Sequence, residues 1–448
     1  MNQPGLPMKL AEPQPRTEPV HTAVNQIRIR RPVRNQVEMM LRDLDSLVSE
    51  DHPVRAIWDF LQGLDLSAFY SSIKAALDTP GRPASDPQVL LGLWVYANIE
   101  GVGSARQLDR LCKEHDTFRW LCGGVPVDYH TLSDFRITRR EALDKMLTEI
   151  VAAMMNQKLV TLKRVAQDGT RVRAGAGEAS FHRKDTLERC LAAAEEQVKR
   201  LADEREHPDP GVSLRERATR ERAARDRAQR VRAALDELPK VEAAKERQRR
   251  TKRKVERAKI TEARVSTTDA EARVMKMPDG GWRPAHNVQL ATDVGSGVIV
   301  GVDVVNQGND AGQAEPMEAQ VERRSGARPA DYLIDGGFAQ LESITTLTKL
   351  PLTVYAPVRP PRTITSGRER STPRRDDTPE VAAWRQRMES EEAKSIYKLR
   401  AATAEWANAQ VRSHGLTRFT VRGLNKALSV VLLVVIAHNL MRWLVLAS

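Results

Sequence analysis

The sequence predicts an α/β protein: an all-helical N-terminal domain followed by a mixed sheet with helices. Apolar residues recur at spacings of three and four through residues 36–158, which is typical of helices packed on a core. From about residue 160 the pattern changes to short apolar runs separated by turn residues, which is typical of strands. A charged helical hairpin, at about 182–262, interrupts this second part. We therefore expect three regions: 1–35, 36–158 and 159–448.

Residues 1–35 are rich in proline and polar side chains, so we expect a disordered basic arm. The end of this arm, IRIRRPVRNQ, places Arg30, Arg31 and Arg34 close together. Two interpretations are open for these arginines. They form a solvated arm, or they lie along a DNA backbone or in a minor groove.

The region 36–158 has the size of a domain that binds DNA ends. Asp86 followed by Pro87 predicts a helix start, because aspartate caps free backbone N–H groups and proline fits the first helical position. In DYHTLSDFR, we expect Thr131 or Ser133 to cap the next helix. The pattern does not indicate which helix would read DNA bases.

Five strands are expected after residue 159. LVTLKRVAQDGTRVRA indicates the first, with Asp168 at its end. AHNVQLATDVGSGVIVGVDVVN indicates two strands joined at Gly295-Ser296-Gly297, and ADYLIDGG indicates a fourth. LPLTVYAPV follows as a further strand. This order, with helices after the strands, predicts a mixed sheet covered by helices.

The charged insertion, about 182–262, is broken at 207–211 by HPDPG, which predicts two helical arms. An apolar seam along the first arm predicts coiled-coil-like pairing with the second. The seam residues are Leu187, Leu191, Ala194, Val198 and Leu201. The second arm ends in a run, 245–259, with nine basic residues, among them Arg249, Arg250, Arg253 and Lys254. The density of positive charge favours phosphate contact over a merely solvated helix face.

Composition indicates a soluble protein that binds a polyanion. The formal net charge is +12 and aromatic content is only 4%, which favours double-stranded DNA held through its phosphates over single strands stacked on aromatic rings. The three cysteines form no CxxC pair, which fits a reducing cytosol. No signal peptide is expected at the N-terminus. The apolar stretch from Ser429 contains His438, Asn439 and Arg442, so we expect a buried core helix and no membrane span.

Three carboxylates stand in distinctive local contexts. Asp168 and Asp335 each follow an apolar strand-like run and precede a glycine, which would expose a carboxylate at a sheet edge. Glu405 shares a predicted helix with Tyr397 and Arg400, and the three fall within one arc of roughly 140°. Three such groups can hold two divalent cations for phosphodiester cleavage. For the other aspartates of this region we expect an ordinary surface role: Asp269, Asp279, Asp293, Asp303 and Asp310.

These segments resemble the bacterial insertion-sequence transposases of the DDE type, with the ribonuclease-H-like core that they share with retroviral integrases. AQDGTRVRA, YLIDGGF and YKLRAATAEWANAQVRSHGLTRF are similar to the three catalytic segments, and EDHPVRAIWDFLQGLDLSAFY is similar to part of the N-terminal helical domain. The resemblance places the catalytic, metal-binding carboxylates at Asp168, Asp335 and Glu405. It maps the Tyr–Arg–Glu–Lys signature onto Tyr397, Arg400, Glu405 and Arg412. Glu405 stands five residues after Arg400, where many relatives have four, and Arg412 replaces lysine.

The resemblance implies a DNA transposase that cleaves element ends and joins them to target DNA with two Mg²⁺ or Mn²⁺ ions. Double-stranded DNA, both terminal inverted repeats and target, is the implied partner, and synapsis of two ends implies a homodimer or higher oligomer. We expect a cytoplasmic, nucleoid-associated bacterial protein. Two alternatives are a catalytically decayed transposase that regulates by binding DNA and a plain metal-dependent nuclease. A small-molecule hydrolase fits least, because no Gly-x-Ser-x-Gly, Cys/His pair, phosphate loop or HExxH occurs.

Overall fold

The computed structural model describes residues 41–71, 83–206, 211–251, 260–359 and 372–447, together with 35, 37, 39, 73, 75 and 257. The chain divides into two compact units, Met1–Asp43 and Leu44–Ser448. All elements below belong to the second unit. The predicted arm residues Arg30, Arg31 and Arg34 lie outside the described residues, as do Arg253 and Lys254.

The N-terminal part of this unit is helical, as predicted. After a 3₁₀ turn, Asp45–Leu47, come α1 (Pro53–Gln62), α2 (Ser67–Tyr70), α3 (Pro87–Ile99), α4 (Ala105–Glu114), α5 (Asp116–Cys122), α6 (Tyr129–Thr138) and α7 (Arg140–Asn156). The Asp86 carboxylate caps α3 by accepting from the Gln88 N–H at 2.8 Å. The cap expected at Thr131 or Ser133 was wrong. Asp128 caps α6 instead, because its carboxylate accepts the N–H groups of His130 and Thr131.

The second part is built on a mixed sheet. Its strands are β1 (Arg164–Arg173), β4 (Arg273–Lys276), β5 (Trp282–Asp293), β6 (Ile299–Val305), β7 (Asp331–Leu333) and β8 (Thr353–Tyr355). The strand order is β4-β5-β1-β7-β8, and β6 pairs with β5. β1, β7 and β8 are parallel, whereas β5 is antiparallel to β1, β4 and β6. The predicted hairpin turn is present, with Gly297 at φ 72°. Two short strands, β2 (Phe181–His182) and β3 (Val265–Ser266), form a separate pair.

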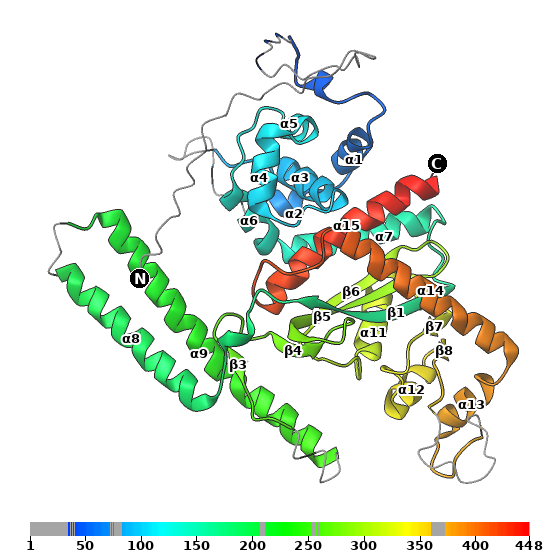
Figure 1. The fold of residues 1–448 in the computed structure, drawn as a ribbon. Helices are drawn as coiled ribbons and strands as arrows, with labels where there is room; N and C mark the ends of the chain where they lie inside the picture. The colour runs from blue at the N-terminus through cyan, green and yellow to red at the C-terminus, as the bar shows by residue number, and fades with distance from the viewer. Residues whose placement is uncertain are drawn as a thin grey trace, which may run out of the picture. The chain divides into compact units, whose positions relative to one another are not determined.

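Helices lie on both sides of the sheet (Figure 1). They are α11 (Ala314–Ser325), α12 (Leu341–Thr348), α13 (Pro379–Arg387), α14 (Glu391–Ser413) and α15 (Leu424–Ala447). α14 contacts β1, β5 and β8, whereas α11 contacts β5 and β6. Neighbouring residues of β1 show that these helices cover opposite faces, because successive side chains of a strand point to opposite sides. Asp168 reaches α14, and Gln167 donates to the Gln313 carbonyl just before α11.

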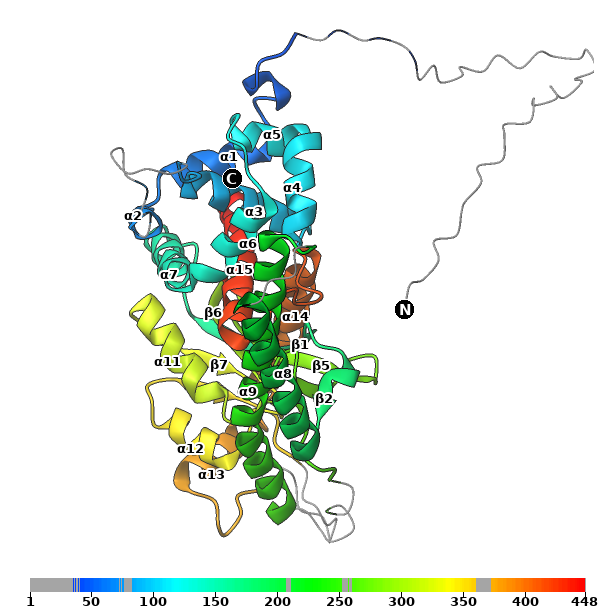
Figure 2. The ribbon, with the colours of Figure 1, turned by 90° about the vertical axis from the view of Figure 1, so that its left-hand side faces the viewer.

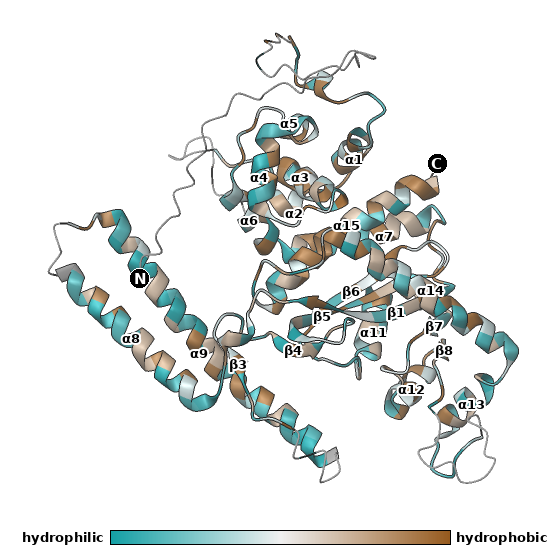
Figure 3. Ribbon diagram, viewed as in Figure 1, coloured by the Kyte–Doolittle hydropathy of each residue, from teal (hydrophilic) through white to brown (hydrophobic). Residues whose placement is uncertain are grey.

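The predicted helical hairpin is formed by α8 (Lys184–Glu206) and α9 (Leu214–Thr251), which lie side by side in both views (Figures 1 and 2). Its seam is confirmed: Leu187, Ala194 and Leu201 are buried, and Leu191 and Val198 are half-buried. The Arg232 guanidinium bonds the Glu195 carboxylate across the two arms at 2.7 Å. Both helices are mostly hydrophilic, in contrast to α15 (Figure 3).

α15 is the buried core helix that the sequence predicts. It packs against α3, α6 and α7 and also against β6, so the helical part and the sheet share one hydrophobic core. Among the described residues it is the one helix with the length and apolarity of a membrane span, but 56% of its most apolar window is buried inside the protein. Its polar residues bind the β5–β6 hairpin. Asn439 exchanges two hydrogen bonds of 2.9 Å with the backbone of Ile299, and the Arg442 Nε donates to the Ser296 carbonyl.

His438 makes the fold acid-sensitive. Its Nε2 lies 2.9 Å from the Gly297 carbonyl, and the ring is buried. Burial lowers the pKa of His438 from 6.5 to about 4, and the nearby His414 and Arg442 act in the same direction. Because the folded pKa lies below the unfolded one, the unfolded state alone takes up a proton between these two pH values. The contribution of His438 to the free energy of unfolding is therefore constant above pH 6.5 and falls as the pH drops towards 4, by about 3 kcal/mol.

We predict that in His438→Gln the free energy of unfolding falls less between pH 6.5 and 4 than in the wild type, because glutamine keeps an N–H donor but does not titrate. Urea unfolding at pH 7, 5.5 and 4.5 measures it. His130→Gln, at an exposed histidine, is the control and should keep the wild-type acid sensitivity. Equal pH dependence in the two variants would contradict the assignment to His438.

Candidate functional site

Asp168 and Asp335 lie at one edge of the parallel part of the sheet. The pairing of β1 with β7 ends where Ala166 stands opposite Leu333. Asp168 and Asp335 each come two residues after this last pair, so the register brings them to the same level on adjacent segments. One expectation was wrong: Asp168 does not end its strand, because β5 continues to pair with β1 as far as Arg173. At Asp168, β1 is therefore paired with β5 on one side, while on its other side β7 has already stopped.

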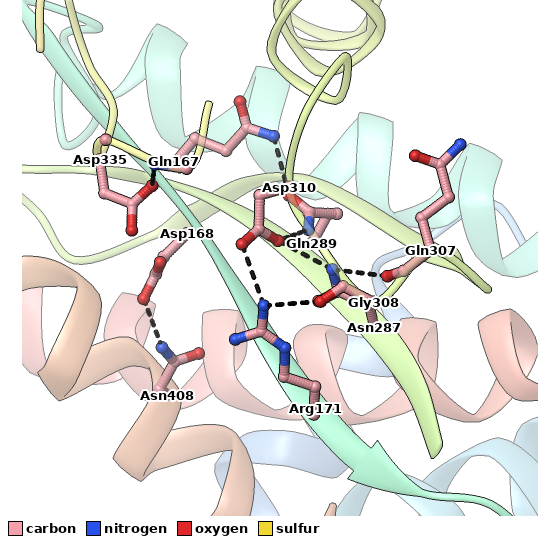
Figure 4. Close-up of polar contacts among 12 residues, drawn as sticks. Gln167, Asp168, Arg171, Asn287, Gln289, Gln307, Gly308, Asp310, Asp335 and Asn408 are labelled. Carbon is pink, nitrogen blue, oxygen red and sulfur yellow. Dashed lines mark hydrogen bonds and ion pairs between the residues drawn. The ribbon is translucent and has the colours of Figure 1, made fainter. Parts of the chain in front are cut away.

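α14 lies over these two aspartates and binds them. The Arg400 Nη2 lies 2.6 Å from the Asp168 Oδ1 and 3.8 Å from the Asp335 Oδ2. The Asn408 Nδ2 donates to the second oxygen of Asp168 at 2.9 Å, as Figure 4 shows. Arg412 reaches β1 two residues further on, where its Nη2 donates to the Thr170 hydroxyl at 2.9 Å. One helix thus supplies a shared cation and an amide to the carboxylates.

The two carboxylates carry more negative charge than the single guanidinium of Arg400 offsets, and they are partly buried. Burial raises the pKa of Asp168, and the charges of Asp335 and Asp310 add to this effect, while Arg400 opposes it. The Asp168 side chain is 22% exposed and that of Asp335 is 35% exposed, so one side of the pair remains open to solvent. A further cation would therefore be favourable here, because it would offset repulsion that one guanidinium leaves in place.

Tyr397 and Glu405 lie on the same helix. Tyr397 is half-buried and packs beside Ala166, Leu333 and Tyr355. Burial raises the pKa of its hydroxyl above the usual value. Glu405 is exposed, and it stands three residues before Asn408 and seven before Arg412.

The structure joins Asp168 and Asp335 through Arg400, but it does not bring Glu405 into contact with them. Among the described residues there is no group of three His, Cys, Asp or Glu side chains placed to hold a metal ion. At about 100° per residue, Glu405 and Arg412 differ by only about 20° around α14. Because Arg412 touches β1, Glu405 lies on the rim of the face that covers the aspartates.

The chemistry of the available groups fits a hard divalent cation. Asp168, Asp335 and Glu405 offer only oxygen ligands, which Mg²⁺ and Mn²⁺ prefer. The Asn408 Oδ1 is buried and has no hydrogen-bond partner among the described residues, although the nitrogen of the same amide binds Asp168. A buried acceptor without a donor is unfavourable. A bound cation, or a water molecule that the cation coordinates, would supply the missing partner.

Of the predicted DNA-binding residues outside the site, Arg249 and Arg250 are described. Both lie on the last turn of α9 and are close to Glu246, at 3.8 and 3.5 Å. Sequence reasoning missed two residues near the aspartates, Asn408 and Asp310. The signal for Asn408 was present, because it stands one helical turn from Glu405 on the predicted helix. The signal for Asp310 was weaker. Only the glycines that follow Asp168 and Asp335 indicated that another segment of the chain packs closely against the backbone at these points.

Comparisons with known protein families identify two segments. Residues 42–138 match a family model described as a transposase domain (DUF772). Residues 361–444 match one described as a transposase DDE domain. The second match contains Tyr397, Arg400, Glu405 and Arg412, whereas Asp168 and Asp335 lie between the two matches. Searches of curated proteins and of solved structures found no match.

We predict that Arg400→Gln destabilises the fold by about 1–2 kcal/mol at neutral pH, a value below that for a fully buried pair because both carboxylates keep some solvent. The physical cause is repulsion between Asp168 and Asp335 once their shared guanidinium is removed. Urea unfolding measures this change. Arg412→Gln is the matched control and should cost less, since within the described residues the Arg412 guanidinium binds a hydroxyl and no carboxylate. Equal losses would show that the guanidinium does not compensate the pair.

Proposed function

Because the chain belongs to the insertion-sequence transposases of the DDE type, we propose that it cleaves the ends of a mobile element and joins them to target DNA. Metal-dependent phosphodiester hydrolysis would free a 3′-hydroxyl, which then attacks the target strand at the same site. The observation that carries the proposal is the in-register placement of Asp168 and Asp335 beneath α14.

The sheet supports a ribonuclease-H-like catalytic core for residues 159–448. Three antiparallel strands, β1, β5 and β6, are followed in the chain by two strands, β7 and β8, that are parallel to β1. In this proposal α8 and α9 form an insertion, since they lie between β2 and β3, outside the main sheet. Residues 36–158 would form the DNA-binding domain and residues 1–35 a basic arm.

Asp168, Asp335 and Glu405 would hold two Mg²⁺ or Mn²⁺ ions. Such ions supply activation of a water and stabilisation of the leaving oxygen. The chain's own residues do the positioning. Asn408 orients the Asp168 carboxylate by binding one of its oxygens. Arg400 contacts both aspartates and so offsets the repulsion between them. Arg400 and Arg412 also place positive charge where a DNA phosphate would lie. Tyr397 packs against the sheet and is not proposed as a nucleophile.

DNA is held mainly by charge in this proposal. The basic residues Arg249, Arg250, Arg253 and Lys254 would add salt-dependent contacts with phosphates, as would the arginines of the N-terminal arm. Two element ends have to be held together for strand transfer, so the working unit would be at least a homodimer.

One observation favours a second candidate, a decayed transposase that regulates by binding DNA. Arg400 already bridges the two aspartates, and Glu405 is exposed and apart from them. In that case the chain would bind element ends but would not cut them.

Plasmid cleavage distinguishes these functions. We predict that wild-type protein with Mg²⁺ cuts a supercoiled plasmid carrying the gene's own flanking DNA at discrete positions. Asp335→Asn and Glu405→Gln at the same salt concentration should reduce cutting by at least about 100-fold, because each removes a negative ligand. Cutting that survives Glu405→Gln would move the third ligand elsewhere. Specific binding without cutting by the wild type would favour the regulator, and cutting without joining would favour a plain nuclease.

Metal binding is testable without activity. We predict that Mg²⁺ raises the thermal midpoint of the wild type, with a gain in unfolding free energy of about 2.7 kcal/mol at one hundred times the dissociation constant. Asp168→Asn should abolish the gain. The control is Asp279→Asn, at an exposed turn aspartate that pairs with Arg283, and it should leave the gain unchanged. An identical Mg²⁺ shift in Asp168→Asn would place the ion elsewhere.

A further inference from the structure

A buried polar layer lies under β1, on the face opposite Asp168. Gln167, Asn287 and Gln289 are fully buried, yet they form a continuous set of hydrogen bonds. The Tyr332 hydroxyl donates to the Gln167 Oε1 at 2.7 Å, and the Gln167 Nε2 donates to the Gln289 Oε1 at 3.0 Å. Such a layer costs desolvation that an apolar layer would not, and hydrogen bonds to its groups reduce this cost. Among the amide atoms of these three residues, the Asn287 Oδ1 alone has no partner within the described residues.

The layer ends at Asp310, in the loop between β6 and α11. Its Oδ1 accepts from both the Asn287 Nδ2 and the Gln289 Nε2, each at 2.8 Å. Its Oδ2 accepts from the Arg171 Nη2 of β1 at 3.3 Å (Figure 4). The side chain is 8% exposed, so the surface role expected from the sequence was wrong for this residue, as it was for Asp269 and Asp293, which are also buried. Asn287 and Gln289 of β5 and Arg171 of β1 together fix the carboxylate against the back of the sheet.

Asp310 fills the space behind both catalytic segments. A Cβ at Gly169, next to Asp168, would meet the Asp310 Oδ1 at 2.2 Å. A Cβ at Gly337, two residues after Asp335, would lie 3.5 Å from the Asp310 Oδ2 and 3.7 Å from its Cβ. The Gly337 N–H in turn donates to the Asp335 Oδ1 at 2.6 Å. The glycine after Asp168 is therefore required by the carboxylate behind it.

We propose that Asp310 is a positioning residue: it holds β1 at Gly169 and the turn at Gly337 in place and so sets the separation of Asp168 and Asp335. The proposal rests on the proposed function, since the spacing matters only if the two aspartates act together. Asp310 acts through backbone neighbours of the aspartates, and the polar layer keeps its carboxylate from moving. Groups that orient metal-binding side chains from behind typically affect metal affinity or activity by about 10- to 100-fold.

Asp310→Asn tests the role with little change of shape. Both oxygens of Asp310 accept hydrogen bonds. In either orientation, the NH₂ group of an asparagine would therefore face another donor, either the Arg171 guanidinium or the side-chain amides of Asn287 and Gln289, and hydrogen bonds would be lost. Asp331→Asn is the matched control. Asp331 also binds an arginine of β1, Arg164, at 2.9 Å, and its side chain is 16% exposed, but it lies at the other end of the β1–β7 pairing.

We expect Asp310→Asn to lower kcat for Mg²⁺-dependent cleavage about 10- to 100-fold with the KM for DNA unchanged, and Asp331→Asn to stay within a few-fold of wild type. Hydrogen exchange supplies a readout that does not need activity. Amides of peptides covering 166–170 and 335–338 should exchange faster in Asp310→Asn than in Asp331→Asn. If Asp310→Asn does not fold, the same comparison can be made with Arg171→Gln as the test and Arg164→Gln as its control. The two arginine side chains are similarly exposed, at 27% and 26%.

Equal cleavage and equal exchange in the Asp310 and Asp331 variants would overturn the positioning role. The proposed function would then still stand if the wild type cuts and Asp335→Asn does not. If the wild type neither cuts nor gains stability from Mg²⁺, the proposed function fails. Hydrogen exchange then shows whether Asp310 still fixes the backbone around the two aspartates. Unchanged exchange at 335–338 in Asp310→Asn would exclude this structural role as well.

Discussion

The parallel pairing of β1 with β7 is the constraint on which the site depends. This pairing is only three residues long, and it stops at the same level on both strands. β1 nevertheless continues as a strand, because β5 pairs with it over nine residues. Asp168 is thereby held on a rigid strand, while Asp335 stands at the start of a turn beside it. A shift of one residue in this register would turn one carboxylate away from the other.

Two carboxylates at this spacing require a helix that can approach closely. Two small side chains of α14, Ala404 and Ala407, are buried. On its other flank Trp406 lies 5.3 Å from the ring of His438 in α15, and the Arg442 guanidinium stands over the Trp406 ring. α15 is itself anchored in the shared core. The position of Arg400 and Asn408 over Asp168 is thus set by packing that extends to the N-terminal helices.

Elements with strong local signals were predictable from the sequence. Examples are the Asp86 cap and the Gly295–Gly297 turn, and the polar residues of α15 also indicated a buried helix correctly. The length of β1 was not predictable, because it depends on pairing with β5, more than a hundred residues away. Nor was the burial of Asp310, because its partner Asn287 lies on β5, outside the loop that carries Asp310. The sequence singled out Asp168 and Asp335 as candidates, but the convergence of Glu405 with them stays a prediction.

The two faces of β1 differ in what they contact: one is partly open to solvent at Asp168, and the other packs against a loop at Gly169. The polar layer allows both. On one face the Asp168 carboxylate remains partly open to solvent. On the other face, the loop that carries Asp310 has to be fixed against Gly169, which has no Cβ to pack against. Apolar packing is non-directional and would hold that loop at no particular position. Hydrogen bonds from Asn287, Gln289 and Arg171 are directional, and all three converge on Asp310. The layer therefore gives up some hydrophobic stabilisation and gains a defined position for the strand that carries Asp168.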